Sequence, residues 1–150
     1  NKKVLIGKQA SRGNFMRYMA DYRIINIFSH AEADTTDTEP RLYMHDSLIH
    51  LSELQALGNK TAVELLVLSA CKTNAGKNAA GEGVYSLARG FASIGVPAVA
   101  ATLWEADEQS IYSLTALFHQ YLSQGTSKDL ALQHAKIDFI KLNNKSEKSA

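Results

Sequence analysis

The sequence predicts an α/β protein of three layers, in which a mostly parallel sheet lies between helices and a small antiparallel hairpin is inserted. Short segments that are apolar throughout recur along the 150-residue chain. Segments with apolar residues at helical spacing separate them. Strands that are buried on both faces and joined through helices form parallel sheets, so this alternation predicts a single α/β domain.

The N-terminal third is expected to hold two strands and a helix. The apolar run at 4–6 is a short strand candidate, and segment 23–28 is rich in the β-branched and aromatic residues that favour strands. Between them, segment 14–22 has apolar residues at helical spacing and predicts an amphipathic helix. The pattern disappears from 29 to 40, and the polar segment 35–40 is expected to be a loop.

The middle of the chain predicts a hairpin, a short helix and a second buried strand. The hairpin is expected at 42–49. Residues 52–55 read Ser-Glu-Leu-Gln, which fits a capping box, so a helix is expected to start there and stop at Gly58. Segment 63–68 is almost entirely apolar and is the second strong strand.

The C-terminal half continues the alternation of helices and strands. Gly95 is a natural stop for the helix before it, because glycine favours the left-handed backbone that ends helices. The folded domain is expected to span residues 1–142, with a frayed tail at 143–150. The expected elements are a loop at 70–81, a helix at 82–94, a strand at 97–103, and helices at 111–125 and 132–142.

Composition excludes several classes of protein. The chain has 16 Lys and Arg against 15 Asp and Glu, a net charge of +1, so no cation surplus favours nucleic acid. Its one cysteine excludes an internal disulfide and a multi-cysteine zinc site. No apolar run approaches the roughly 20 residues that span a bilayer, and no signal peptide is recognisable. We expect a cytoplasmic protein, cut from something longer because it lacks an initiator Met.

Two of the strong strands end in reactive side chains. Segment 24–28 is followed by Ser29 and His30, and segment 63–68 leads into Cys71. Active sites of open parallel sheets form outside the carboxyl ends of the strands. If the two strands are neighbours, a thiol nucleophile and an imidazole base emerge at one edge, as a Cys-His dyad requires.

His30 and Cys71 could each also have a purely structural role. A lone cysteine is usually a small buried hydrophobe, and a lone histidine is usually structural. The position of both residues at the ends of separate buried strands favours catalysis over that interpretation.

The surrounding residues resemble the CHAT-domain peptidases, a caspase-like family usually attached to tetratricopeptide repeats. The resemblance runs in family order from about Val4 to Leu142 and is specific because several motifs occur together. They are Ile-Phe-Ser-His at 27–30, Leu-Ser-Ala-Cys-Lys-Thr at 68–73, Gly-Glu-Gly at 81–83 before the helix, and Leu-Trp-Glu-Ala-Asp at 103–107.

The resemblance implies a thiol protease, a hydrolase in which His30 is the general base and acid and Cys71 the nucleophile. Backbone amides at Cys71 and Ala31 would form the oxyanion hole. The family normally has Gly after the histidine, and Ala31 disfavours the positive φ that Gly allows. The chain resembles only the C-terminal, catalytic half of a full CHAT domain. A repeat-containing or other regulatory partner is expected, and neither a cofactor nor a metal is implied.

An acidic segment after the third strong strand is a candidate substrate-binding region. In caspase-like folds this region helps line the pocket for the residue before the scissile bond. Trp104, Glu105 and Asp107 would therefore contact substrate, and their acidic groups would favour Arg or Lys. Alternatively, Asp107 caps the helix that follows, and Trp104 belongs to the core.

Three functions fit the sequence to different degrees. The first is a cysteine endopeptidase acting on a protein or peptide. The second is a catalytically impaired interaction module, which Ala31 favours. The third, a nucleotide-binding or receiver-like domain, lacks a phosphate loop or an acidic cluster at the best-defined strand ends. His45 and His50 are interpreted as surface residues rather than metal ligands, because no further ligand lies nearby in sequence.

Overall fold

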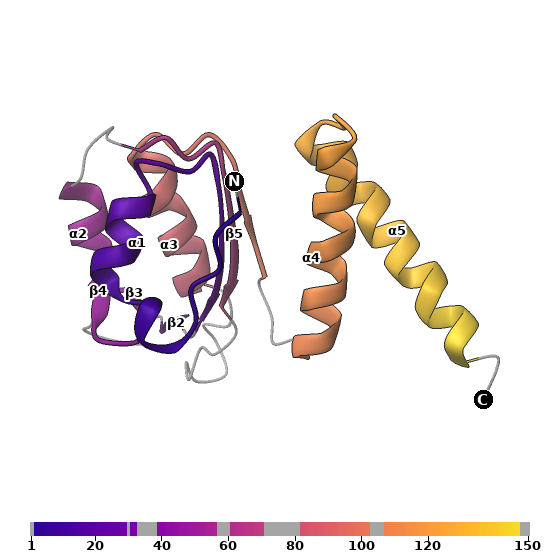
Figure 1. Cartoon of the computed structure of the whole chain (residues 1–150), viewed down its shortest axis with the longest axis horizontal. Helices are drawn as coiled ribbons and strands as arrows, with labels where there is room; N and C mark the ends of the chain where they lie inside the picture. Colours follow the sequence, from indigo (N-terminus) through magenta and orange to yellow (C-terminus); the bar gives the residue numbers. More distant parts are fainter. Residues whose placement is uncertain are drawn as a thin grey trace. The chain divides into compact units, whose positions relative to one another are not determined.

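A computed structural model describes residues 2–29, 31–32, 39–56, 61–70, 82–102 and 107–147. The chain divides into two compact units, residues 1–105 and residues 106–150. The first unit contains both sheets, and the second consists of two helices. Each unit is described by itself below (Figure 1).

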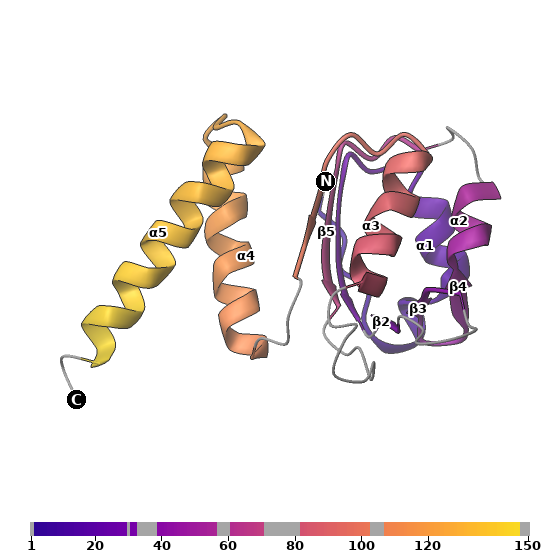
Figure 2. The same ribbon diagram turned by 180° about the vertical axis from the view of Figure 1, so that it is seen from behind.

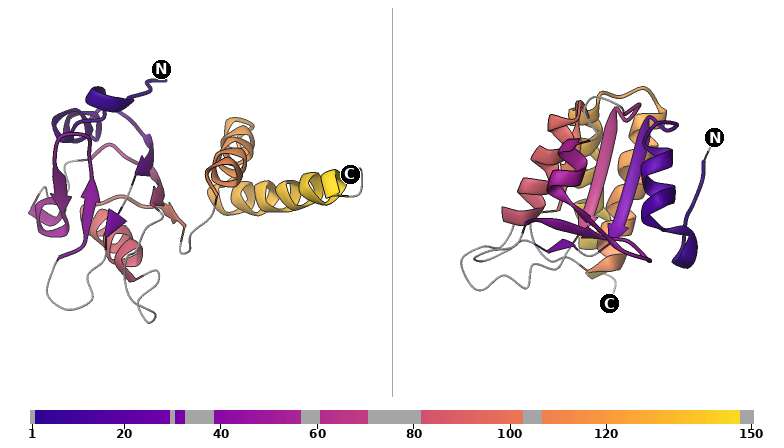
Figure 3. Two further views of the ribbon diagram at one scale, coloured as in Figure 1. Left: turned by 90° about the horizontal axis from the view of Figure 1, so that it is seen from below. Right: turned by 90° about the vertical axis from the view of Figure 1, so that its left-hand side faces the viewer.

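The first unit is built on a parallel sheet. Its strands are β1 (Ile24–Ser29), β5 (Leu65–Ala70) and β6 (Val99–Ala101), and their order is β1-β5-β6. Both pairings are parallel, which confirms the α/β class with a mostly parallel sheet. Figure 3 shows β1 and β5 running side by side in the same direction.

Three helices lie on one face of this sheet, as Figures 1 and 2 both show. They are α1 (Arg12–Tyr18), α2 (Leu51–Ala56) and α3 (Glu82–Ser93). Ile27 of β1 and the fully buried Leu66 and Leu68 of β5 join the core that these helices cover. Phe15 of α1 meets Phe91 of α3 edge to face, with ring centroids 6.3 Å apart. Because successive side chains of a strand point to opposite faces, one set of β1 side chains points into this core.

A small antiparallel sheet accompanies the parallel one. Its strands are β2 (Ala31–Glu32), β3 (Arg41–Tyr43) and β4 (Leu48–His50), in the order β2-β3-β4. The pairing of β3 with β4 confirms the predicted hairpin. No pattern in the sequence predicts β2, which pairs with β3. A strand so short has no periodicity from which it could be predicted.

Two further expectations in the first unit are wrong. Residues 4–6 form no strand; the side chain of Ile6 is 75% exposed, and a short 3-10 helix follows at Gly7–Gln9. The predicted capping box at 52–55 is also displaced, because α2 begins at Leu51. Glu53 instead accepts a hydrogen bond from the backbone amide of His50 at 2.9 Å, the reach expected of the third residue of a helix toward its cap.

The helix stop at Gly95 is confirmed. Its φ is +94°, and the amide of Val96 bonds back to the carbonyl oxygen of Phe91 at 3.2 Å. This is the left-handed termination that glycine makes inexpensive.

The second unit is a helical hairpin of α4 (Glu108–Ser123) and α5 (Lys128–Glu147). Gly125 turns the chain between the helices with a φ of +81°. Phe118 of α4 and the small residues Ala131 and Ala135 of α5 are buried. The helix α5 runs through Glu147, past the expected boundary at 142 and into the segment expected to be a frayed tail. Within the residues described, no helix is both long and apolar enough to cross a membrane.

Candidate active site

The carboxyl ends of β1 and β5 lie level with each other. Six consecutive residue pairs are in parallel register between the strands, and the last pair joins Ser29 to Ala70. In the sequence, His30 follows Ser29 directly and Cys71 follows Ala70 directly. Both proposed catalytic residues lie outside the described residues, so the structure gives the ends of the strands that lead to them. The expectation that these two strands are neighbours is confirmed.

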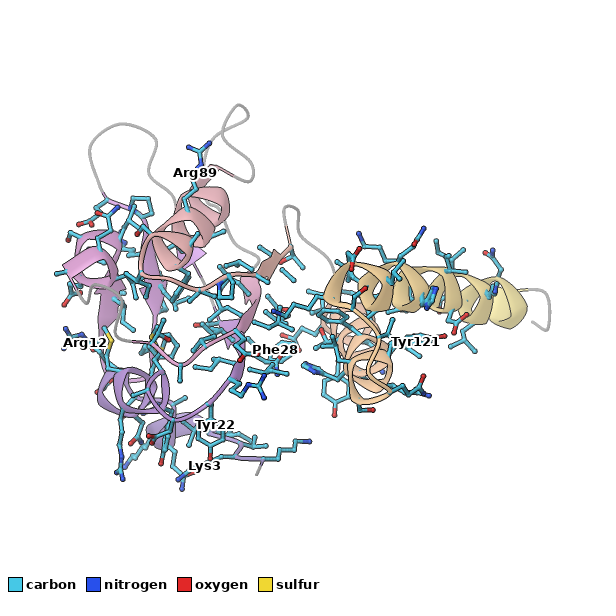
Figure 4. All side chains as sticks on the ribbon, turned by 90° about the horizontal axis from the view of Figure 1, so that it is seen from above. Lys3, Arg12, Tyr22, Phe28, Arg89 and Tyr121 are labelled. Atoms are coloured by element: carbon cyan, nitrogen blue, oxygen red, sulfur yellow. The ribbon has the colours of Figure 1, made fainter. Side chains whose placement is uncertain are left out.

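The register of β1 and β5 also determines which of their side chains share a face of the sheet. Residues that are register partners in a parallel sheet direct their side chains to the same face. Phe28 is paired with Ser69, and these two residues precede His30 and Cys71 by two positions each. Phe28 and Ser69 therefore lie on the same face at this edge of the sheet. The Phe28 side chain is 54% exposed and is labelled on β1 in Figure 4.

The chain around His30 passes from one sheet into the other. On its N-terminal side, the hydroxyl of Ser29 donates a hydrogen bond to the backbone carbonyl of Tyr43 in β3. On its C-terminal side, Ala31 is the register partner of Leu42, also in β3. Sequence reasoning missed this arrangement, because neither the Ser29 hydroxyl bond nor a two-residue strand leaves a pattern in the sequence.

Ala31 stands where the family normally has glycine. Its backbone belongs to β2, and no residue other than glycine has a positive φ in the described part of the chain. Extended backbone is open to alanine as much as to glycine. The conformation found here therefore gives no reason why alanine should be excluded.

Asp107 is the N-cap of α4, as the alternative interpretation of this residue predicts. Its side chain accepts a hydrogen bond from the Ser110 amide at 2.8 Å. Hydrogen bonds from the Ser110 side chain and amide hold the pKa of this carboxyl below its usual value. Asp107 is exposed and ionised at neutral pH. Trp104 and Glu105 lie outside the described residues.

The histidines at 45 and 50 are in the β3–β4 hairpin region, as predicted. His45 is exposed, and the Nδ1 atom of His50 lies 3.9 Å from a carboxylate oxygen of Glu39. Among the described residues, no group of three or more His, Cys, Asp or Glu side chains is arranged to hold a metal ion.

The fold and these strand ends define a class of protein: a mixed α/β domain with two neighbouring parallel strands, one followed in the sequence by a histidine and the other by a cysteine. The CHAT domain family model matches residues 1–150, so the chain belongs to the CHAT family. This family is related to the caspase-like cysteine peptidases. A search of the curated proteins finds no match.

Proposed function

We propose that this chain is a cysteine peptidase that hydrolyses peptide bonds with Cys71 as nucleophile and His30 as general base and acid. The observation that carries the proposal is the register of β1 and β5. Ser29 and Ala70 are paired, and the next residue of each strand is one member of the dyad. Neighbouring parallel strands are about 4.8 Å apart, which is within the reach of a cysteine and a histidine side chain for one another.

The proposed chemistry proceeds in two steps. His30 takes the proton of the Cys71 thiol, and the thiolate attacks the carbonyl carbon of the scissile bond. The imidazolium then protonates the leaving amine as the C–N bond breaks, which leaves a thioester on Cys71. Water, deprotonated by His30, hydrolyses the thioester and regenerates the thiol. Backbone amides at Ala31 and Cys71 stabilise the oxyanion of each tetrahedral intermediate.

We further propose that the substrate is a protein or peptide cleaved after a basic residue. Trp104, Glu105 and Asp107 would line the pocket for that residue. The Asp107 side chain is exposed, and an ionised carboxylate attracts Arg or Lys. A repeat-containing regulatory partner is proposed from the family alone.

Alkylation of Cys71 tests the dyad. Because the chain has one cysteine, labelling with iodoacetamide reports on this thiol alone. We expect alkylation of the folded chain at pH 7 to exceed that of the chain unfolded in urea, because a paired thiolate replaces a thiol of pKa about 8.5. His30→Gln should abolish the excess, whereas His45→Gln, a change at an exposed histidine, should retain it.

Cleavage is tested with fluorogenic peptides that carry Arg, Lys or Asp before the scissile bond. Cys71→Ala and His30→Gln should each remove activity, and Arg and Lys should be preferred. A Cys71 that reacts no faster folded than unfolded, together with no cleavage of any peptide, would contradict the proposal. That result would favour the non-catalytic interaction module. Preference for Asp would overturn the basic specificity alone.

A further inference from the structure

The segment that contains His30 is attached to the same strand on both sides. Resting on the proposed function, we propose that Ser29 is a positioning residue, which fixes the backbone at His30 through its hydrogen bond to Tyr43. Ser29 would touch neither the substrate nor the thiol. It would act by holding the histidine in the orientation that pairs it with Cys71.

The first attachment is the side chain of Ser29 itself. Its backbone belongs to the last register pair of β1 and β5, and its hydroxyl donates to the carbonyl oxygen of Tyr43. The bond joins residues that are 14 positions apart in sequence and is partly buried. Ser29 thus ties the end of the parallel sheet to the antiparallel sheet.

The second attachment follows immediately after the histidine. Ala31 of β2 is the register partner of Leu42 in β3. Leu42 and Tyr43 are consecutive residues of β3, so the anchors on the two sides of His30 fall on adjacent positions of one strand. Ser29 and Ala31, the residues before and after His30 in the sequence, are therefore both held by β3.

The strand that supplies both anchors is itself fixed. The side chains of Leu42 in β3 and Ile49 in β4 are fully buried in the core. The turn of the hairpin is tied to the start of α1, because the amide of Arg12 donates to Asp46 at 2.8 Å. The amide of His45 also donates to the carbonyl of Ala10 at 2.9 Å. The acceptor of the Ser29 bond is therefore held from several directions.

The physical consequence concerns precision at the dyad. Misplacement of a catalytic group by about 1 Å can cost on the order of 10²-fold in rate. With Ser29→Ala, the pairing of Ala31 with Leu42 remains but the anchor before His30 is lost. The strand end can then move relative to β3, and His30 would spend less time in position to receive the thiol proton.

The pH profile of Cys71 alkylation separates positioning from simple structural support. The experiment uses the full chain and compares wild type with Ser29→Ala, Ser29→Thr, Ser93→Ala and His30→Gln. Ser93 is the matched control, because its hydroxyl also donates to a backbone carbonyl, that of Gly90, at 2.7 Å in a partly buried setting. Unfolding in urea measures the stability of each variant in parallel.

We expect Ser29→Ala to slow alkylation at pH 7 by roughly threefold to tenfold, the range that one neutral hydrogen bond supports. Its profile should move toward that of an ordinary cysteine, with a pKa of about 8.5. Ser29→Thr should restore the wild-type profile, because threonine keeps the hydroxyl and suits a strand. Ser93→Ala should lower stability without moving the profile.

Each outcome decides one question. If His30→Gln leaves the profile unchanged, the proposed dyad fails, whatever Ser29 does. If His30→Gln alters the profile but Ser29→Ala matches Ser93→Ala, the dyad stands and the positioning role of Ser29 is overturned. Should Ser29→Ala fail to fold, Ser29→Val, which suits a strand and lacks the hydroxyl, takes its place, and a wild-type profile in folded Ser29→Val would overturn the positioning role. Failure of Ser29→Thr to retain the wild-type profile would overturn it equally.

Discussion

Ser29 and Ala70 are register partners at the carboxyl ends of two adjacent parallel strands. Each is followed in the sequence by a residue of the proposed dyad, His30 after Ser29 and Cys71 after Ala70. A slip of one residue would direct the side chains of Ser29 and Ala70 to opposite faces, because strand side chains alternate. The catalytic proposal therefore depends on strand register.

Asp107 allows helix capping to be separated from substrate recognition. Asp107→Ala removes both the cap and the charge, and we expect it to lower Tm. Asp107→Ser retains a capping oxygen for the Ser110 amide and should preserve Tm while it removes the charge. If the carboxylate reads a basic residue, Asp107→Ser should reduce the ratio of kcat/KM for Arg over Asp peptides. An unchanged ratio would leave Asp107 with the capping role alone.

Ala31 tests whether the family's glycine is needed at that position. Its backbone is in a strand and its φ is not positive, so Ala31→Gly relieves no strain. We expect kcat/KM to stay within about threefold, well short of the 10²- to 10³-fold that one oxyanion-hole donor is worth. Peptide cleavage by the two proteins, at matched folded concentration, measures this. An increase approaching 10²-fold would show that alanine impairs the oxyanion hole.

Tyr121 and Asp138 give the helical hairpin a dependence on pH. The Tyr121 hydroxyl donates to a carboxylate oxygen of Asp138 at 2.5 Å, joining α4 to α5, and Figure 4 labels Tyr121. This bond lowers the pKa of Asp138 and raises that of Tyr121. The contribution of Asp138 is present above its unfolded pKa of about 3.9 and is lost as pH falls through the lower folded value.

The sign is opposite for Tyr121. Its contribution is present below the unfolded pKa of about 10 and is lost as pH rises through the higher folded value. Tyr121→Phe should therefore reduce stability most between about pH 4 and 10 and least outside that range. Urea midpoints across pH measure this. Tyr112→Phe, at an exposed tyrosine of the same helix, should have little effect at any pH; a Tyr121→Phe effect independent of pH would contradict the prediction.

Gly90 marks a close approach of α3 to α2. A Cβ added at Gly90 would overlap the Cδ1 atom of Leu51. Gly90→Ala gains up to about 1 kcal/mol of helix propensity, and the partly buried Leu51 side chain must turn aside to make room for it. We expect this displacement to cancel part of the gain in wild type. In the Leu51→Ala background the overlap is removed, and the same change should stabilise. Urea unfolding of all four proteins tests it, and equal effects in both backgrounds would contradict the close approach.

The sequence by itself determined the class of fold, the main strands and the residues that follow them. Segments 24–28 and 63–68 are almost entirely apolar, and short apolar runs that alternate with helical segments are typical of buried parallel strands. Gly95 and Asp107 were also predictable, because helix ends depend on local backbone and capping chemistry. The motifs around His30 and Cys71 indicated the CHAT family.

Only the tertiary structure decided which residues face one another. The pairing of Ser29 with Ala70 joins segments far apart in the chain, and no local preference sets that register. The anchoring of Ser29 on Tyr43 and the two-residue strand β2 likewise exist only once β3 is in place. Residues 4–6 show the converse, since an apolar run suited to a strand lies outside both sheets. A strand is completed by hydrogen bonds to a neighbour, and that neighbour is supplied by the fold.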